Sequence, residues 1–230
     1  MKITVFTAHC ERPEAWLLCQ KYLARQTRAP DQWLVVDSSP EPSKTDLPCD
    51  YHHRPDLEKM SDKVLWAIEN NLIQGDAVVW YENDDWYHPE WIEWCERYLP
   101  QFDIVGQGLA MYYHVGQRWW SDCKNARHAS LCQTAIRREL LPFLTNLIKG
   151  FDNQFFDTRL WRLEKKRFLE LPLDDAGRLV IGMKGLPGKL GYSNEHRPEI
   201  PPNVTLDPAL FKLWKLIGQD AAAYLPFYRP

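Results

Sequence analysis

Three short apolar runs, each followed at once by polar residues, constrain the fold of this chain more than any other feature of its sequence. The runs are Ile3–Phe6, Trp33–Val36 and Ala77–Tyr81, and each is rich in β-branched or aromatic residues. Amphipathic helical patterns separate them, and the first begins near Pro13, a residue suited to a first helical turn. Alternating strands and helices predict parallel strand pairs joined by right-handed crossovers. We therefore expect an α/β fold with a mixed, mostly parallel central sheet and flanking helices.

The same patterns predict the remaining elements. Ser61 is expected to cap a helix that ends at Gly75, and another helix is expected to begin near Pro89. Residues 38–56 hold four prolines and are expected to form a long surface loop. In the less regular second half, the sequence predicts strands at Ile104–Val105 and within Leu109–Trp120, and helices at 137–148, 158–167 and 208–225.

The composition is that of a soluble globular protein. The chain has 230 residues, of which 45% are hydrophobic and 26% are charged, and this length suits one large domain or two small ones. No apolar run approaches the roughly 20 residues that span a bilayer. The six cysteines are scattered singly, which argues against a zinc site or a disulfide framework and favours reduced, mostly buried thiols. We expect a cytoplasmic protein that requires neither a membrane nor an obligate protein partner.

Polar clusters at the ends of the three runs predict one ligand site. They are Thr7-Ala8-His9, Asp37-Ser38-Ser39 and Glu82-Asn83-Asp84-Asp85. In open parallel sheets, ligands lie beyond the carboxyl ends of the strands, where the loops converge and helix N-termini point at the ligand. The three clusters are therefore expected to meet at one edge of the sheet.

The third cluster is acidic. Glu82, Asp84 and Asp85 place three carboxylates within four residues directly after an apolar strand. Their repulsion and desolvation would be costly unless a cation neutralised them, and Mg²⁺ and Mn²⁺ prefer oxygen ligands of this kind. A divalent metal site is the favoured interpretation. The alternative is a solvated acidic turn that caps the helix near Pro89.

Taken together, these motifs resemble a known family. The strings V-F-T-A-H-C-E-R-P at 5–13, V-V-D-S-S-P at 35–40 and V-V-W-Y-E-N-D-D-W-Y-H-P-E-W at 78–91 are similar to those of family-2-like glycosyltransferases with the GT-A fold. The resemblance implies an enzyme that moves a sugar from a nucleotide sugar, most simply a UDP-sugar, to an acceptor hydroxyl. It also implies one domain, 1–230, in which residues 1–100 bind the donor and residues 101–230 bind the acceptor and carry the C-terminal loop and helix.

By this resemblance, the first two loops hold the nucleotide. Thr7 and Asp37 would contact the nucleobase or the ribose. Ala8, His9 and Arg12 belong to the same donor-binding loop as Thr7.

The resemblance also assigns the metal loop and a lysine. Lys63 would lie near the base or the diphosphate, and Glu82 with Asp84 would bind the ribose and the metal. Asp85 would be a further metal ligand, so that Mn²⁺ or Mg²⁺ is the implied cofactor. The sequence departs from the family pattern in two places: Glu82 stands where the family has Asp, and Ser38 replaces the second acidic residue of the second loop.

A fourth motif resembles the family's catalytic segment. The stretch Phe156–Leu163 is similar to the E-D-x-x-L-W motif, in which the Asp is the catalytic base of an inverting reaction, and Phe156 replaces the Glu. This similarity assigns Asp157 as the base that deprotonates the acceptor, with Asp152 as the second candidate. Either Asp can instead cap the helix that follows.

Glycine and basic residues are densest between Lys184 and Pro198. Glycines let backbone N–H groups approach an anion, and Lys184 and Lys189 would supply positive charge for a departing diphosphate. By resemblance to family members that close a C-terminal loop on the donor, His196 would be a further metal ligand. The alternative is an ordinary turn-rich loop.

The acceptor is suggested by a weaker resemblance. Lys184–His196 and Trp214–Ala221 are similar to segments of small phage-type glycosyltransferases that decorate hydroxymethylated pyrimidines in DNA, which implies a bacterial or phage-infected host cell. The tract Arg118–Ser130 would line the acceptor cleft or belong to a Trp-rich core. A basic face for DNA would come from Arg118, Lys124, Arg127, Arg137, Arg138, Lys165, Lys166 and Arg167.

Other functions remain open on the sequence. The acceptor can instead be a cell-surface saccharide or a small molecule. A nucleotidyltransferase can use similar strand-end carboxylates, and a binding module can keep the fold without turnover. The formal net charge of −3 gives no global attraction to DNA, so a DNA acceptor would require a local basic patch.

Overall fold

Two sheets form the framework of the protein. The computed structural model describes residues 1–123, 125, 127–150, 156–163, 168–170, 177–189 and 200–228. The large sheet has seven strands in the order β10-β6-β9-β4-β1-β2-β3, and the small sheet has five in the order β12-β8-β7-β11-β5. The strands of the large sheet are β1 (Ile3–His9), β2 (Gln32–Asp37), β3 (Asp50–His53), β4 (Ala77–Trp80), β6 (Ile104–Gly106), β9 (Thr134–Arg137) and β10 (Phe168–Glu170).

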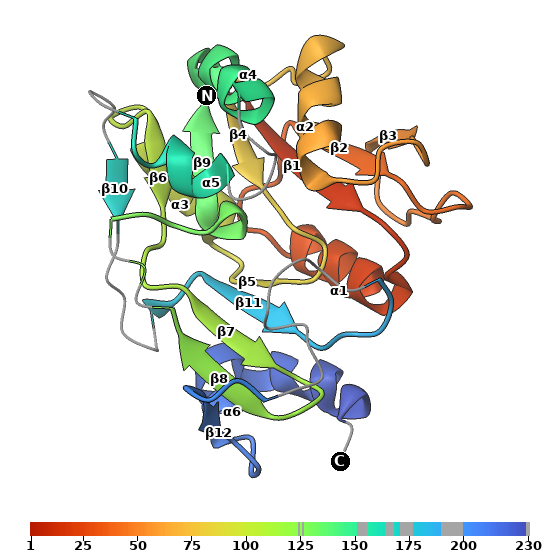
Figure 1. The fold of residues 1–230 in the computed structure, drawn as a ribbon, viewed down its shortest axis with the longest axis vertical. Helices are drawn as coiled ribbons and strands as arrows, with labels where there is room; N and C mark the ends of the chain where they lie inside the picture. Colours follow the sequence, from red (N-terminus) through yellow and green to blue (C-terminus); the bar gives the residue numbers. More distant parts are fainter. Residues whose placement is uncertain are drawn as a thin grey trace.

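The small sheet and the helices complete the chain. The strands of the small sheet are β5 (Trp86–Tyr87), β7 (Met111–His114), β8 (Trp119–Asp122), β11 (Val180–Lys184) and β12 (Thr205–Leu206). The α-helices are α1 (Pro13–Ala24), α2 (Met60–Glu69), α3 (Trp91–Tyr98), α4 (Leu141–Gly150), α5 (Phe156–Leu160) and α6 (Phe211–Ile217). The 3₁₀ segments are Leu131–Gln133, Arg138–Leu140 and Gly218–Phe227. Figure 1 shows the small sheet and α6 at the opposite end of the molecule from α2 and α4.

The predicted parallel core of the large sheet is confirmed. β1 pairs in parallel with β2 and with β4, and β2 pairs in parallel with β3. Among the described strands of this sheet, β9 alone runs antiparallel to its neighbours, β4 and β6. The sheet is therefore mixed and mostly parallel, as the sequence predicts.

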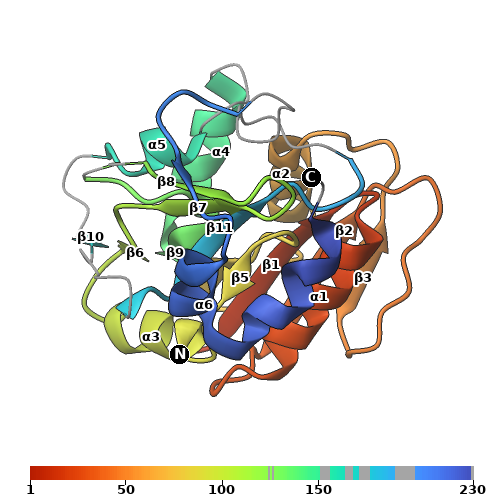
Figure 2. The same ribbon diagram turned by 90° about the horizontal axis from the view of Figure 1, so that it is seen from below.

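The large sheet is covered on both faces. Ile3 and Val5 of β1 pack in one buried cluster with side chains of α1 and α3, and the alternate residues Phe6 and Ala8 pack in a second cluster with α2, α4 and α5. This alternation follows from the two-residue period of a strand. Figure 2 shows the two helical layers on either side of the sheet. All six cysteines are thiols, and three of them are buried.

Two predicted elements of the first half need correction. The stretch 38–56 contains β3, an edge strand whose Asp-Tyr-His-His sequence carries no apolar strand signal. Ser61 is not the cap of α2, because Lys59 occupies that position and Ser61 lies buried inside the first turn. Gly75 does not end the helix, which stops at Glu69; a Cβ on Gly75 would lie 2.5 Å from the backbone nitrogen of Thr4, so glycine is required there for close approach to β1.

The predicted helices of the second half are shorter than expected. The segment expected at 137–148 begins as the end of β9 and becomes α4 only at Leu141. The helix expected at 158–167 is α5, Phe156–Leu160, and residues 164–167 lie outside the described residues. The C-terminal helix divides into α6 and a 3₁₀ segment at Gly218, whose φ of +55° does not continue an α-helix.

Candidate active site

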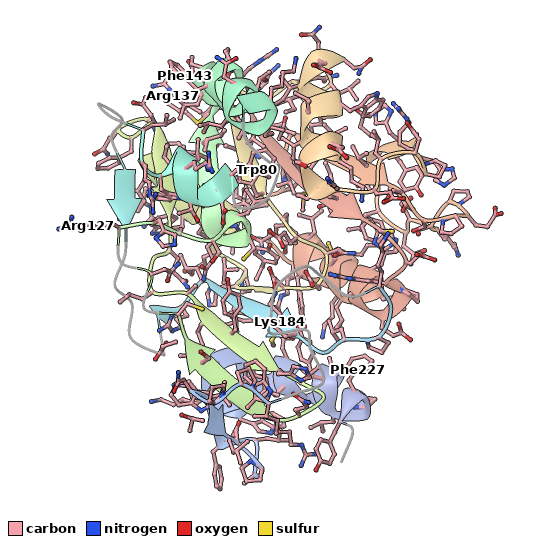
Figure 3. The ribbon with its side chains drawn as sticks, viewed as in Figure 1. Trp80, Arg127, Arg137, Phe143, Lys184 and Phe227 are labelled. Carbon is pink, nitrogen blue, oxygen red and sulfur yellow. The ribbon has the colours of Figure 1, made fainter. Side chains whose placement is uncertain are left out.

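The carboxyl ends of β1, β2 and β4 lie side by side at one edge of the large sheet. His9 is paired with Asp37 across the ends of β1 and β2, and β4 lies on the other side of β1. β11 of the small sheet ends at the same place, because the backbone N–H of Met183 donates a hydrogen bond to Oδ1 of Asp85 at 2.9 Å. Figure 3 labels Lys184, the last residue of β11, near the middle of the molecule. The structure thus brings the three polar clusters together and adds β11 to them.

Glu82, Asp84 and Asp85 form an acidic cluster directly after β4. One carboxylate oxygen from each residue lies within 4.8 Å of those of the other two. Asp84 and Asp85 are 5% and 1% exposed, and Glu82 is half-buried. The Oδ2 atom of Asp85 is buried and has no hydrogen-bond partner within the described part of the chain. Because an unsatisfied buried carboxylate oxygen is costly, this atom is available as a ligand for a cation.

The alternative of a solvated acidic turn that caps α3 is wrong. Asp84 and Asp85 are buried rather than solvated. The residue at the N-cap of α3 is Glu90, and no side chain caps that helix by a hydrogen bond.

Two cationic side chains contact the acidic cluster. Nζ of Lys184 lies 3.9 Å from Oδ1 of Asp85. Arg12 forms an ion pair with Oδ2 of Asp84. The sequence indicates a basic character for both positions but not these partners, because the contact between β11 and Asp85 is a long-range feature of the fold.

The charges in the cluster shift one another's pKa values. Burial, with repulsion from Asp85 and Asp84, raises the pKa of Glu82. Burial also raises the pKa of Asp85, although Lys184 acts in the opposite direction. Burial alone would lower the pKa of Lys184, but attraction by the three carboxylates outweighs it and raises that pKa. A charged lysine thus lies among carboxylates that resist ionisation.

The acidic cluster fits a hard divalent cation. Its side-chain ligand atoms are all carboxylate oxygens, which Mg²⁺ and Mn²⁺ prefer. The Oδ2 atom of Asp85 has no hydrogen-bond partner among the described residues, and a bound cation would provide a partner for it. Such a cation would share the cluster with Lys184 and Arg12.

Asp37, at the end of β2, is fixed by a network of donors. Its Oδ1 accepts a hydrogen bond from the backbone N–H of Ser39 at 2.8 Å. Its Oδ2 accepts bonds from the backbone N–H of Ser43 at 3.0 Å and from the hydroxyl of Tyr51 at 2.5 Å. Burial would raise the pKa of Asp37, but the bonds from Ser39 and Tyr51 outweigh burial and lower it to about 2. Asp37 is therefore an ionised side chain that organises the second loop.

The predicted donor-binding side chains of the first loop are engaged inside the protein. The hydroxyl of Thr7 is buried and accepts a hydrogen bond from the indole N–H of Trp33 at 3.0 Å. The ring of His9 packs at a tilt against Trp16, with ring centres 4.6 Å apart, and is hydrogen-bonded through Nδ1 to Asn83 at 2.7 Å. Burial lowers the pKa of His9 to about 4, so the ring is neutral at pH 7. Thr7 and His9 thus support this loop from within.

Lys63 of α2 belongs to a group of cations beside the acidic cluster. It is 3% exposed, and its ammonium donates a hydrogen bond to the carbonyl of His9 at 3.0 Å. Burial lowers the pKa of Lys63 to about 8, and repulsion from Lys189 and Arg12 acts in the same direction. Ala8 lies beneath this loop in the apolar core. The structure therefore brings three basic side chains to the edge that carries the acidic cluster.

The segment after β11 is docked on the first loop. The backbone N–H of Lys189 donates to the carbonyl of Glu11 at 3.0 Å, and Nε of Arg12 donates to the carbonyl of Lys189 at 2.6 Å. Gly188 has a φ of +105°, and a Cβ there would lie 2.2 Å from the carbonyl oxygen of Glu11. The predicted proximity of this segment to the donor loop is therefore a direct backbone contact, and glycine is the residue that permits it.

Asp157 lies in α5 on the side of the acidic cluster. Burial raises its pKa, and backbone N–H groups of Thr158 and Leu131, with the nearby His128, oppose that shift. Asp157 is near enough to Glu82 to raise the pKa of that residue. The two remaining predicted site residues, Asp152 and His196, lie outside the described residues.

Two tyrosines that the sequence analysis does not single out position the site. The hydroxyl of Tyr87 accepts a hydrogen bond from the backbone N–H of Glu82 at 2.7 Å, and its ring stacks on Tyr81 at 3.6 Å. The hydroxyl of Tyr51 donates a hydrogen bond to Oδ2 of Asp37. Tyr87 lies two residues after the acidic motif, so its nearness to the site could be predicted from the sequence. Tyr51 lies on β3, whose polar sequence gives no strand signal.

The tract Arg118–Ser130 contributes to the buried core, and its place in an acceptor cleft stays a prediction. Trp119 is fully buried, and Trp120 lies beneath the ammonium of Lys212 at 4.0 Å. The guanidinium of Arg118 stacks on Tyr228 at 3.5 Å. The Trp-rich core interpretation is confirmed for Trp119.

The described members of the predicted basic face are spread over the molecule. Arg137 is paired with Ala77 at the start of β4, whereas the acidic cluster follows the end of that strand. Arg137 also forms an ion pair with Glu139 at 2.9 Å. Figure 3 shows Arg137 far from Lys184. Arg137 therefore does not belong to a face at the candidate site, and Lys124, Lys165, Lys166 and Arg167 lie outside the described residues.

Comparisons with known proteins establish the fold. The sequence matches no protein-family model and no curated protein. The structure is similar to that of S. aureus TarS, with a TM-score of 0.54 and 14% sequence identity over 80% of this chain and 37% of that chain. It is also similar to S. aureus TarS 1–349 in complex with UDP, with a TM-score of 0.52, 13% identity, and 80% and 60% of the two chains covered. This chain thus spans less than two thirds of the length of these structures.

The GT-A fold predicted from the motifs is confirmed. The mixed, mostly parallel large sheet with helices on both faces agrees with the similarity to TarS. At these identities the likeness extends to the fold alone. Within the described ranges, no helix is long and apolar enough to cross a membrane.

Proposed function

We propose that this protein is a glycosyltransferase that transfers a sugar from a nucleotide sugar, with UDP as the nucleotide, to an acceptor hydroxyl. The observation that carries the proposal is the meeting of acidic and basic groups at one edge of a GT-A sheet. The acidic cluster lies beside Arg12 and Lys184, and Lys63 and Lys189 lie near Arg12. The basic side chains suit a diphosphate, and the carboxylates suit the cation that accompanies it. The complex of TarS 1–349 with UDP supports the choice of nucleotide to test first.

The donor would lie across the loops that follow β1, β2 and β4. Asp37 organises the second loop for the nucleobase or ribose, and Thr7, Ala8 and His9 shape the first loop. Lys63, Arg12 and Lys189 would bind the diphosphate, and Lys184 would face it from β11. Residues 1–100 would thus carry most of the donor site, with β11 and the segment after it as contributions from residues 101–230.

Asp84 and Asp85 would hold a divalent metal, with Glu82 beside them and His196 as a further candidate ligand. A bound Mn²⁺ or Mg²⁺ supplies positive charge that stabilises the departing diphosphate. The all-oxygen donor set and the Oδ2 atom of Asp85 support this assignment.

Asp157 would act as the catalytic base. Its carboxylate would accept the proton of the acceptor hydroxyl, whose oxygen then forms a bond with the anomeric carbon of the sugar. The bond from that carbon to the diphosphate oxygen breaks, and the electron pair leaves with the nucleoside diphosphate. Attack opposite the leaving group inverts the anomeric centre. The location of Asp157 near Glu82 supports this role, and Asp152 is the second candidate.

The acceptor to test first is a 5-hydroxymethylpyrimidine in DNA, supported by the sequence resemblance of Lys184–His196 and Trp214–Ala221. A saccharide or small-molecule acceptor is the alternative. An assay of sugar transfer to hydroxymethylated and unmodified duplexes, run beside a panel of oligosaccharides, separates the two.

The donor assignment is tested by thermal unfolding with UDP-, GDP- and CMP-sugars, each with and without Mn²⁺. Binding to the folded state raises the melting temperature, so one nucleotide sugar should give a shift that depends on Mn²⁺. Asp85→Asn should abolish the Mn²⁺-dependent part. Asp103→Asn serves as a control outside the site, because the carbonyl of Asp103 accepts a hydrogen bond from Arg137, which lies beside the start of β4. A shift with a nucleoside triphosphate alone would indicate a nucleotidyltransferase. A shift without turnover on any acceptor would indicate a binding module.

A further inference from the structure

Lys184 is a buried cation inside the acidic cluster. Its side chain is 8% exposed, and that of Asp85 is fully buried. Nζ lies 3.9 Å from Oδ1 of Asp85 and 5.0 Å from the centre of the Tyr112 ring. Burying an ammonium is costly unless opposite charge compensates it, and the carboxylates of the cluster provide that charge.

The backbone fixes Lys184 in this position. The preceding residue, Met183, donates its N–H to Oδ1 of Asp85 at 2.9 Å. The following residue, Gly185, has a φ of +78°, and a Cβ there would lie 2.2 Å from the ring of His114. The chain on both sides of Lys184 is therefore held against its neighbours, so the ammonium remains at the cluster.

The charge balance determines how the cluster receives a metal ion. Three carboxylates face the cations of Lys184 and Arg12, so the cluster carries at most one net negative charge. A divalent cation then makes the cluster net positive, and Lys184 repels it at close range. A diphosphate adds negative charge and relieves that repulsion. The positive charges of Lys184 and Arg12 therefore disfavour binding of the metal alone. They favour binding of the metal together with the diphosphate.

We propose that Lys184 is the resident counter-cation of the acidic cluster and makes the binding of a divalent metal and of a nucleoside diphosphate mutually dependent. The inference rests on the proposed function only in taking these two as the ligands of the site. Lys184 would weaken the affinity of the empty cluster for metal and would contact the diphosphate once both are bound. Its charge acts on the metal and on the diphosphate, and it is not the base of the reaction.

Titration of the protein with Mn²⁺, measured by calorimetry with and without saturating UDP, tests the proposal. Without UDP, Lys184→Met should bind Mn²⁺ at least about tenfold more tightly than the wild type. UDP should tighten Mn²⁺ binding to the wild type by about tenfold and should have a much smaller effect on the variant. Lys149→Met is the matched control, because it removes a lysine of α4 whose ammonium pairs with Glu69 at 2.7 Å. This variant should bind Mn²⁺ and UDP as the wild type does.

A folded Lys184→Met protein that binds Mn²⁺ no more tightly than the wild type would overturn the proposal. Should this variant not fold, the wild type and Lys184→Arg decide: both keep the positive charge and should show coupling of UDP to Mn²⁺. UDP binding with no effect on Mn²⁺ affinity would contradict the role of Lys184 but leave the proposed function intact. If the wild type binds neither Mn²⁺ nor UDP, both the role of Lys184 and the proposed function are contradicted. The absence of UDP binding distinguishes this result from the preceding one.

Discussion

At the scale of single residues, the site depends on carboxylates with different tasks. Asp37 is ionised and fixed by three donors, Asp84 and Asp85 are buried beside cations, and burial raises the pKa of Asp157. A base for an acceptor hydroxyl benefits from a raised pKa, because its conjugate acid then forms more readily near neutral pH. Burial thus raises the pKa of Asp157, as the proposed base requires, whereas hydrogen bonds keep Asp37 ionised.

Asp157→Asn removes the proposed base with little change in shape. We expect kcat to fall by about 10²–10⁴, while the affinity for the donor stays within twofold, since the base does not contact the nucleotide. Steady-state kinetics and donor titration measure the two quantities. Asp152→Asn is the comparison: if it causes the larger loss of kcat, Asp152 is the base and the assignment of Asp157 fails.

The network around Asp37 predicts a pH dependence of stability. The folded pKa is about 2, lowered from 3.8, so the stabilisation is present above about pH 4 and is lost as the pH falls toward 2. Tyr51→Phe removes one donor to Asp37 and should lower the free energy of unfolding at pH 7 by about 1–2 kcal/mol. Urea unfolding between pH 7 and 2 should show a smaller loss on acidification for this variant.

The matched control for that measurement is Tyr228→Phe, which removes the hydroxyl of a 40%-exposed tyrosine. It should leave both the stability and its pH dependence unchanged. Equal acid sensitivity of Tyr51→Phe and the wild type would show that Tyr51 does not stabilise the ionised form of Asp37.

At the scale of elements, local signals predicted the parts of the site that lie on adjacent strands. β1, β2 and β4 each carry an apolar run followed by a polar cluster, and parallel pairing then places the clusters together. The sequence did not predict β3, because Asp50–His53 is polar, nor β9, whose short run precedes a helical pattern. It also did not predict that Lys184 meets Asp85, because that contact depends on how β11 packs over a long sequence separation.

The docking of the segment after β11 on the first loop is testable through one glycine. Gly188→Ala introduces a Cβ at 2.2 Å from the carbonyl oxygen of Glu11 at a φ of +105°, so the segment must move away from Arg12. We expect the Kd for the nucleotide sugar to rise about tenfold, with a loss of stability of about 1 kcal/mol or more. Calorimetry and urea unfolding measure the two effects.

Gly150→Ala is the control for this substitution. Among the described residues, no atom outside the backbone of α4 and the neighbours of Gly150 lies within 4 Å of the position of its Cβ, and Gly150 ends α4, away from the site. Its donor affinity should equal that of the wild type. Unchanged donor affinity in Gly188→Ala would mean that the docked segment does not contribute to donor binding.

At the scale of the whole molecule, the C-terminal segment is fastened to the first helix. Asp220 accepts a hydrogen bond from the indole N–H of Trp86 at 2.8 Å, forms an ion pair with Arg25, and lies 3.3 Å from Nζ of Lys21. The hydroxyls of Tyr22 and Tyr224 are hydrogen-bonded at 2.9 Å nearby. The C-terminal segment thus stabilises α1, which follows the loop after β1.

Asp220→Asn tests whether this fastening stabilises the protein through charge. Burial would raise the pKa of Asp220, but the bonds from Trp86 and Arg25 outweigh burial and lower it. Because the folded pKa lies below the unfolded value of about 3.9, the stabilisation exists above that pH and disappears as the pH falls through the folded pKa. We expect the variant to lose about 2 kcal/mol in urea unfolding at pH 7 and progressively less as the pH falls below about 3.9. Glu69→Gln, in an exposed ion pair with Lys149, should change stability by less than about 0.5 kcal/mol. An equal loss for Asp220→Asn across this pH range would show that shape rather than charge joins the C-terminal segment to α1.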